Sequence, residues 1–295
     1  PHLFSYLQVR VDEDGRMGRF VITGSQQFGL NVRIAQSLAG RVGAVILLPF
    51  SLDELAAVER RPASLDTAIW TGFYPPLYDR KLDPGVWYDN YERTYLERDL
   101  RQLTTIQDLS VFLRFLRLCA GRTGQLVNYS ALASDVGVSP NTVRNWLSLL
   151  EASFVVRMLP PHHRNFNKRL VKSPKLYFLD PGLAASLLGI TAADQLATHP
   201  LRGAQFETLV FSELLKTRLN AGKRAELSFW RDNHGRGVDF LCEEGGRLHA
   251  IEARSALTVT ASSLKGLLDF ARIAGPASPR LTLVHGGEQT FESQG

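Results

Sequence analysis

The sequence predicts an α/β protein built from several domains. Three observations support this prediction. Apolar, strand-like segments alternate with helical segments near the N-terminus, and in the middle two helices joined by a tight turn precede a basic hairpin. Near the C-terminus, a helix is followed by strands that contain acidic residues. At about 100–200 residues per domain, 295 residues correspond to two or three domains. We place the predicted domains at residues 1–105, 106–179 and 180–295.

The composition is that of an ordinary globular protein and excludes disorder. Hydrophobic residues make up 44% of the chain and charged residues 21%. The two cysteines, Cys119 and Cys242, are too few for a disulfide framework or a cysteine-based zinc site, so a reducing, cytoplasmic setting is expected. The longest apolar run, at residues 44–50, is too short for a bilayer, and the first residues do not form a signal peptide, so no membrane partner is expected.

The N-terminal third predicts an α/β unit. Residues 19–23 and 43–48 form short apolar runs typical of buried parallel strands, with a helical pattern at residues 27–38 between them. Residues 51–59 begin with a capping box formed by Ser51 and Glu54. A loop is expected at residues 71–85 and a charged helix at residues 87–101.

The middle of the chain predicts a winged helix-turn-helix. An amphipathic helix at residues 108–121 precedes a short helix at 131–136, a turn at Gly137 and a second helix at 141–151, capped by Ser139 and Pro140. Two short strands, at residues 154–159 and 175–179, then enclose a basic segment. Residues 141–175 contain seven basic residues and one acidic residue, within a chain of net charge +5.

This arrangement suits contact with DNA. Small polar and basic side chains on the second helix fit base edges and phosphates, and the hairpin lysines fit phosphates. The candidate DNA-binding residues are Asn141, Thr142, Arg144, Asn145, Lys168, Arg169, Lys172 and Lys175. Winged helices also serve as protein-binding modules, so a protein partner stays open as the alternative.

The C-terminal part combines a helix with two strands that contain acidic residues. Glu207 lies on an amphipathic helix at residues 203–216, Asp239 lies in a strand at 238–242, and Glu252 and Arg254 lie on the return strand at 247–253 and just after it. An acid on one strand and Glu-x-Lys on the next resembles the PD-(D/E)xK nuclease fold. In that fold the two carboxylates hold Mg²⁺, which activates water.

The resemblance implies Glu207, Asp239, Glu252 and Arg254 as site residues and Asp239 and Glu252 as metal ligands. The chain departs from the motif because Arg254 replaces the lysine, and an arginine does not give up its proton. We therefore expect a degenerate site in which Arg254 neutralises the carboxylates. An active Mg²⁺-dependent nuclease and a metal-binding site without cleavage are the alternatives.

Several stretches taken together resemble the prokaryotic AAA-type ATP-binding proteins that have an uncharacterised C-terminal domain. They are VITGSQQF at residues 21–28, SLAGRV at 37–42, LPFSLDEL at 48–55, YLERDL at 95–100, KRLVKSPKLYF at 168–178 and FWRD at 229–232. The resemblance implies ATP and Mg²⁺ as cofactors of intact members, and it implies that this chain starts downstream of the P-loop and the Walker B strand. Residues 1–105 would then be the remainder of the ATPase domain, with its helical lid.

The resemblance also implies nucleotide-sensing roles for Thr23, Ser25, Arg41 and Arg98. No G-x-x-x-x-G-K-[ST] motif occurs in the chain, so ATP hydrolysis by this polypeptide, and a bound cofactor in it, are not expected. Arg41 and Arg98 are equally well explained as helix-end or ion-pair residues.

Three functions follow from these observations. The first is a non-hydrolysing DNA- or protein-binding module that forms the C-terminal portion of an AAA-type ATP-binding protein. The second is a Mg²⁺-dependent DNA endonuclease that uses Asp239 and Glu252. The third is an interaction protein that docks on an intact ATPase subunit.

Overall fold

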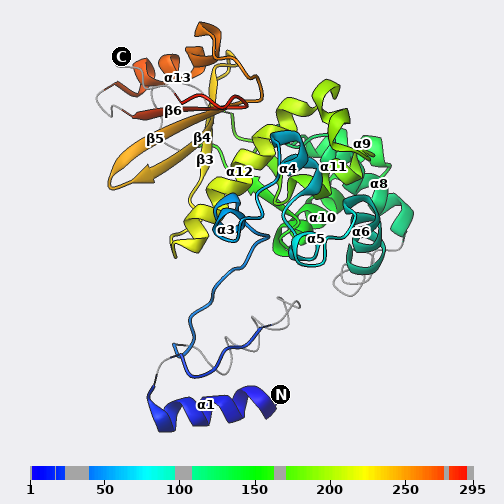
Figure 1. Cartoon of the computed structure of the whole chain (residues 1–295), viewed down its shortest axis with the longest axis vertical. Helices are drawn as coiled ribbons and strands as arrows, with labels where there is room; N and C mark the ends of the chain where they lie inside the picture. Colours follow the sequence, from blue (N-terminus) through cyan, green and yellow to red (C-terminus); the bar gives the residue numbers. More distant parts are fainter. Residues whose placement is uncertain are drawn as a thin grey trace. The chain divides into compact units, whose positions relative to one another are not determined.

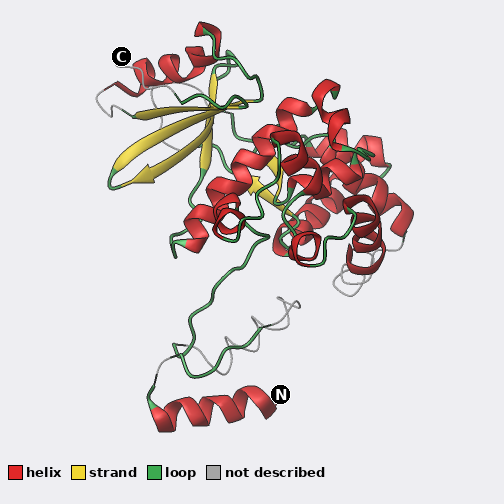
Figure 2. Cartoon of the chain, viewed as in Figure 1, coloured by secondary structure: helices red, strands yellow, loops and turns green. Residues whose placement is uncertain are grey.

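A computed structural model describes residues 2–16, 18–23, 40–96, 108–162, 171–275 and 279–290 (Figure 1). The chain divides into two compact units, Pro1–Leu47 and Leu48–Gly295. The described residues form helices and two small sheets, so the protein is of mixed α/β class (Figure 2). Within these residues, every helix is too short or too polar to cross a lipid bilayer.

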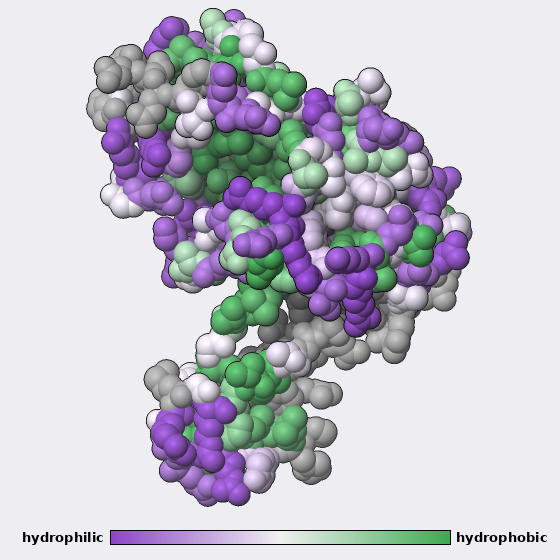
Figure 3. All heavy atoms as spheres, in the orientation of Figure 1, coloured by the Kyte–Doolittle hydropathy of each residue, from purple (hydrophilic) through white to green (hydrophobic). Residues whose placement is uncertain are grey.

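The first unit contains one described helix, α1 (His2–Asp14). The two strands predicted at residues 19–23 and 43–48 are wrong, because both segments have irregular backbone. Val21, Val45 and Leu47 are at least 80% exposed, and apolar residues are visible on the surface of this unit (Figure 3). A strand needs a neighbour to satisfy its backbone groups, and neither segment has one among the described residues. The helix predicted at residues 27–38 lies outside the described residues.

The second unit begins with the capped helix that the sequence predicts. Helix α3 (Leu52–Ala57) starts at Ser51, whose hydroxyl accepts the Glu54 N–H while the Glu54 carboxylate accepts the Ser51 N–H. Two hydrogen bonds hold the backbone of Phe50, just before α3. The Phe50 N–H donates to the Phe73 carbonyl (2.9 Å), and the Phe50 carbonyl accepts a hydrogen bond from the buried Lys216 ammonium (2.8 Å).

Three short helices and one π-helical turn follow. They are α4 (Leu65–Thr71), α5 (Pro75–Asp79), α6 (Pro84–Tyr91) and η1 (Glu92–Leu96). Helix α5 lies within the segment predicted as loop, where Pro75 and Pro76 occupy the first helical turn, the position in which proline loses no hydrogen bond. The helix predicted at residues 87–101 starts earlier, because Asp83 caps α6. Its last residues lie outside the described part.

Three further helices and a two-stranded sheet form the middle of the second unit. They are α8 (Leu109–Ala120), α9 (Tyr129–Val136), α10 (Pro140–Ala152), β1 (Val156–Leu159) and β2 (Lys175–Phe178). Strands β1 and β2 pair in an antiparallel manner. The Trp146 ring of α10 packs against Phe112 and Phe115 of α8, so the predicted apolar stripes of the two helices meet in one core.

A buried carboxylate joins this region to the next helix. Asp180 caps α11 (Pro181–Leu187) and accepts hydrogen bonds from the Leu183 N–H, the Phe73 N–H and the Tyr88 hydroxyl. A Cβ at Gly182 would lie 2.6 Å from the Gly72 backbone, so only glycine permits this approach. The 3₁₀-helix η2 (Ala193–Thr198) follows.

The C-terminal part is a four-stranded sheet between two helices. Its elements are α12 (Arg202–Asn220), β3 (Ser228–Arg231), β4 (Gly237–Glu244), β5 (Arg247–Arg254), α13 (Ala261–Ala274) and β6 (Arg280–His285). The strand order is β3-β4-β5-β6, with β5 and β6 parallel. Helix α12 packs on one face of the sheet, and helix α13 packs on the other face (Figure 1). Each helix forms a separate hydrophobic core with the face that it covers.

Candidate functional site

The predicted acidic residues converge at one end of this sheet. Glu207 of α12, Asp239 of β4, and Glu252 and Arg254 of β5 lie together with Lys175 of β2. We call these five residues the carboxylate–lysine cluster. A cavity of about 190 Å³ is lined by four of them, Lys175, Asp239, Glu252 and Arg254, and by residues of β3 such as Arg231.

Asp239 lies at a point where the backbone hydrogen bonding between β4 and its neighbouring strands is interrupted. The pairing of β4 with β5 ends at Phe240 and Ile251, and the register between β3 and β4 shifts at the same level. Beyond that point the Ala253 N–H donates to Asp239 Oδ2 (3.2 Å). The side chain of Asp239 thus replaces a backbone acceptor, which holds its carboxylate between the two strands.

Lys175 supplies the central positive charge. Its Nζ lies 2.8 Å from Glu207 Oε1 and 3.0 Å from Asp239 Oδ1, and the residue is only 7% exposed. Burial alone would lower the pKa of Lys175, but the carboxylates of Asp239 and Glu207 outweigh it and raise the pKa. Lys175 therefore remains a buried ammonium. Its prediction as a DNA contact is wrong, since a buried, ion-paired amine cannot reach a phosphate.

Glu207 is held by two donors. The Tyr177 hydroxyl and the Lys175 ammonium both donate to Glu207 Oε1. Burial raises the pKa of Glu207, the nearby Asp239 raises it further, and Lys175 opposes both. Burial also raises the pKa of Tyr177 far above its usual value, so its hydroxyl acts here as a hydrogen-bond donor.

Glu252 pairs with Arg254, whereas Asp239, the other carboxylate that the sequence predicts Arg254 to neutralise, pairs with Lys175. Arg254 Nη2 donates to Glu252 Oε1, whereas Glu252 Oε2 is buried and has no hydrogen-bond partner. Burial, followed by the charge of Asp239, raises the pKa of Glu252 to about 7. Glu252 is thus the least satisfied carboxylate of the cluster.

The donor set does not fit the metal ion that the nuclease resemblance implies. Both oxygens of Asp239 and one oxygen of Glu207 are already bonded to N–H or O–H donors. Among the described residues, no group of three or more His, Cys, Asp or Glu side chains is arranged to hold a metal ion. The Lys175 ammonium lies where a cation shared by Glu207 and Asp239 would have to lie.

The exposed face of α10 is a second candidate surface. Asn141, Arg144 and Asn145 are exposed, while Val143, Trp146 and Leu147 are buried, as the helical pattern predicts. The hydroxyl of the half-buried Thr142 lies 2.8 Å from that of Ser139 at the helix cap. The Arg144 guanidinium lies over the Tyr129 ring, at 4.2 Å from its centroid.

Lys172 is the one predicted hairpin contact whose side chain is both described and exposed. Lys168 and Arg169 lie outside the described residues. Neither prediction about them is tested by the structure.

The predicted nucleotide-sensing residues do not form a site within the described part of the chain. Thr23 is exposed on irregular backbone, and Arg41 forms an ion pair with Asp12 of α1. The ion-pair alternative for Arg41 thus agrees with the structure. Ser25 and Arg98 lie outside the described residues.

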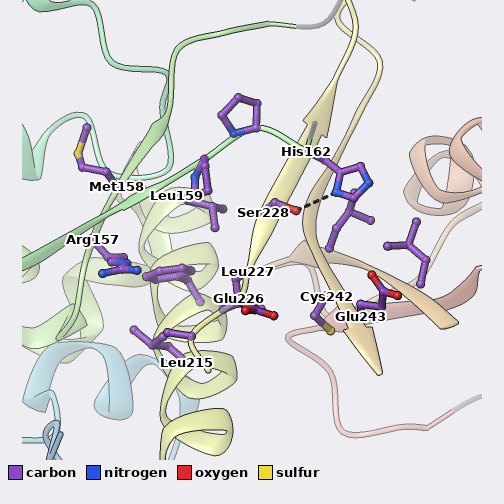
Figure 4. A pocket seen from close by; sticks show the side chains of 16 residues that line it. Arg157, Met158, Leu159, His162, Leu215, Glu226, Leu227, Ser228, Cys242 and Glu243 are labelled. Atoms are coloured by element: carbon purple, nitrogen blue, oxygen red, sulfur yellow. Dashed lines mark hydrogen bonds between the residues drawn. The ribbon is translucent and has the colours of Figure 1, made fainter. Parts of the chain in front are cut away.

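A larger cavity of about 420 Å³ lies between the end of β1, helix α12 and strands β3–β5 (Figure 4). Its lining is mainly apolar and includes Leu215, Leu227 and Cys242, and His162 Nδ1 lies 3.3 Å from the Ser228 hydroxyl at one side. None of the predicted site residues lines this cavity.

Sequence reasoning missed Lys175 as a member of the cluster and Tyr177 as a donor to its Glu207. The signal was present in the alternation of β2, because period two places Lys175 and Tyr177 on one face and Leu176 and Phe178 on the other. A lysine in a short, otherwise apolar strand requires a buried carboxylate partner. The sequence did not indicate which carboxylate this would be.

The chain matches three family models along its length. Residues 1–56 match an AAA domain, residues 62–194 match a domain of unknown function (DUF8612), and residues 202–295 match another domain of unknown function (DUF4143). No solved structure matches the chain significantly.

Two curated relatives are similar to nearly the whole chain. They are the uncharacterized proteins Rv2008c of Mycobacterium tuberculosis and Mb2031c of Mycobacterium bovis, each 33% identical over 294 residues. These residues cover 99% of this chain and 64% of each relative, so the chain spans less than two thirds of their length. The chain is thus similar to an AAA domain over its first 56 residues and to DUF4143 over residues 202–295.

Proposed function

We propose that the chain is the C-terminal portion of an AAA-type ATP-binding protein and acts as a non-hydrolysing module that binds duplex DNA. In this proposal α8, α9, α10 and the β1–β2 hairpin form a winged helix-turn-helix, and α10 is the helix that enters the major groove. The observation that carries the proposal is the face of α10: Asn141, Arg144 and Asn145 are exposed on a helix whose opposite face is firmly packed.

The chemistry of this face favours nucleic acid. An arginine reads guanine or a phosphate, and asparagines read adenine edges. The exposed Lys172, three residues before β2, adds a phosphate contact. Affinity should therefore be dominated by phosphate contacts and should fall steeply with salt.

The test is fluorescence anisotropy of a labelled duplex across a salt series. Arg144→Ala and Lys172→Ala should each weaken binding and reduce the slope of log affinity against log salt by about 0.9 per lost phosphate contact. Lys265→Ala is the matched control, because Lys265 is an exposed lysine on α13, which is not an element of the proposed winged helix. A slope near zero in the unaltered protein, or equal effects of all three variants, would favour a protein partner instead.

Divalent-cation-dependent DNA cleavage is the second candidate function. The convergence of Glu207, Asp239 and Glu252 favours it, and the ammonium of Lys175 among them opposes it. Nicking of plasmid DNA with Mg²⁺ or Mn²⁺ that Asp239→Ala abolishes would support this candidate.

A further inference from the structure

We propose that the Lys175 ammonium is a built-in counter-ion that occupies the position of a divalent cation and keeps the carboxylate–lysine cluster free of metal. Removal of this one charge should convert the cluster into a Mg²⁺- or Mn²⁺-binding site. The proposal concerns the cluster alone and does not depend on DNA binding by α10.

The first argument is geometric. Lys175 Nζ bridges Glu207 and Asp239 at 2.8 and 3.0 Å, so one compact cation already joins a carboxylate of α12 to a carboxylate of β4. The opposite oxygen of Asp239 accepts the Ala253 N–H. A divalent cation between Glu207 and Asp239 would have to lie against the ammonium, and the repulsion between the two positive charges opposes its binding there.

The second argument is the fixed position of the amine. Lys175 is 7% exposed and pairs through its backbone with Leu159 of β1. Its ammonium lies 5.6 Å from the centroid of the Phe229 ring and 6.0 Å from that of Tyr177. A side chain enclosed by two rings and two carboxylates does not exchange readily with a hydrated ion in solution.

The third argument is what the cluster would become without the amine. Three carboxylates would remain with one arginine, and one of them, Glu252, lines the same cavity and has an oxygen, Oε2, that lacks a hydrogen-bond partner. An all-oxygen set of carboxylates suits Mg²⁺ and Mn²⁺. The cavity of about 190 Å³ has room for the ion and for several of its waters.

The amine also comes from a different part of the fold than the carboxylates. Lys175 belongs to the β1–β2 hairpin, whereas Asp239, Glu252 and Arg254 belong to the four-stranded sheet. The usual Glu-x-Lys spacing would place the amine on β5 itself. Here Arg254 occupies that position and pairs with Glu252, so Glu207 and Asp239 depend on the hairpin for their counter-ion.

The test measures Mn²⁺ binding to the full chain by the electron paramagnetic resonance signal of free Mn²⁺. Lys175→Gln should bind one Mn²⁺ ion at the cluster. The unaltered protein should bind Mn²⁺ there at least about tenfold more weakly, because it retains a like charge adjacent to the metal. Asp239→Asn in the Lys175→Gln background should abolish the gained site.

Two further variants serve as controls. Lys172→Gln removes an exposed lysine three positions earlier and should leave Mn²⁺ binding unchanged. If Lys175→Gln loses the native circular dichroism spectrum, the double variant Lys175→Gln/Glu207→Gln removes one charge of each sign and should fold and bind Mn²⁺ through Asp239 and Glu252.

Two results would overturn the proposal. One is Mn²⁺ binding by the unaltered protein that is as tight as in Lys175→Gln and is lost in Asp239→Asn. The other is a folded Lys175 variant, single or double, that binds no Mn²⁺.

Discussion

Two buried carboxylates in this chain are satisfied to very different degrees. Asp180 accepts three hydrogen bonds, from the Tyr88 hydroxyl (2.6 Å) and from the N–H groups of Phe73 (2.7 Å) and Leu183 (2.8 Å). Glu252 accepts from Arg254 on one oxygen, and its other oxygen has no hydrogen-bond partner. A buried carboxylate with all its hydrogen bonds formed stabilises the fold. A buried carboxylate oxygen without a hydrogen bond lowers stability, and such groups are typical of functional sites.

The raised pKa of Glu252 predicts a pH-dependent stability. In the native protein Glu252 keeps its proton up to about pH 7, whereas the unfolded chain loses it near 4.5. The native state therefore binds more protons in this window, and the free energy of unfolding should fall as the pH rises from about 4.5 to about 7. Between pH 5 and 7.5 the loss due to Glu252 should be about 2 kcal/mol.

Urea unfolding of the unaltered protein and of Glu252→Gln at these two pH values measures the effect. The variant cannot ionise at this position, so its stability should fall by about 2 kcal/mol less than that of the unaltered protein. The groups that act on Glu252, namely Asp239, Arg254, Lys175 and Glu207, are retained in both proteins. Glu226→Gln, at an exposed site, should leave the pH dependence intact. Parallel pH curves for the protein and Glu252→Gln would contradict this prediction.

At the scale of elements, the turn between α9 and α10 depends on one backbone conformation. Gly137 ends α9 with φ +83° and donates its N–H to the Ala133 carbonyl, and Ser139 then caps α10. A Cβ at Gly137 would meet no atom within 4 Å, so the need for glycine comes from the backbone conformation rather than from crowding.

Gly137→Ala should therefore destabilise the protein by about 1 kcal/mol in urea unfolding, the cost of a left-handed conformation for alanine. Gly121→Ala is a matched control, because Gly121 ends α8 with φ −65° and has only ordinary contacts at its Cβ position. That variant should be neutral or slightly stabilising. Equal losses in the two variants would contradict a specific role for the left-handed conformation at Gly137.

At the scale of the whole molecule, the division into two units lies between Leu47 and Leu48. Val45 and Leu47 are 80% and 83% exposed on irregular backbone. Three residues beyond Leu47, Phe50 is hydrogen-bonded to Phe73 and Lys216. The chain thus passes from an exposed apolar segment into a packed structure within a few residues.

Limited proteolysis with a broad-specificity protease should cut within residues 42–47 before it cuts any helix or strand of the second unit. Exposed irregular backbone fits a protease cleft without local unfolding. Val86 is an internal control, since it is 63% exposed but lies in helix α6. Mass spectrometry of the early fragments identifies the first cleavage sites. Early cleavage at Val86 with residues 42–47 intact would contradict the prediction.

The sequence alone determined the features that depend on near neighbours. The capping box at Ser51, the turn at Gly137, the stripe of α10 and the pairing of Glu252 with Arg254 all involve residues within one or two turns or on one strand. The strands predicted at residues 19–23 and 43–48 did not form, because an apolar run becomes a strand only beside a partner.

Only the tertiary structure decided the role of Lys175. Its two partners lie 32 and 64 positions further along the chain, on a helix and on a strand of another sheet. A local pattern indicates that a lysine faces inward, but the carboxylate that it meets depends on how α12, β2 and β4 pack together. The sequence therefore predicted a basic hairpin residue for DNA, and the packing made it the counter-ion of the acidic cluster, because a buried charge must be paired where the fold places it.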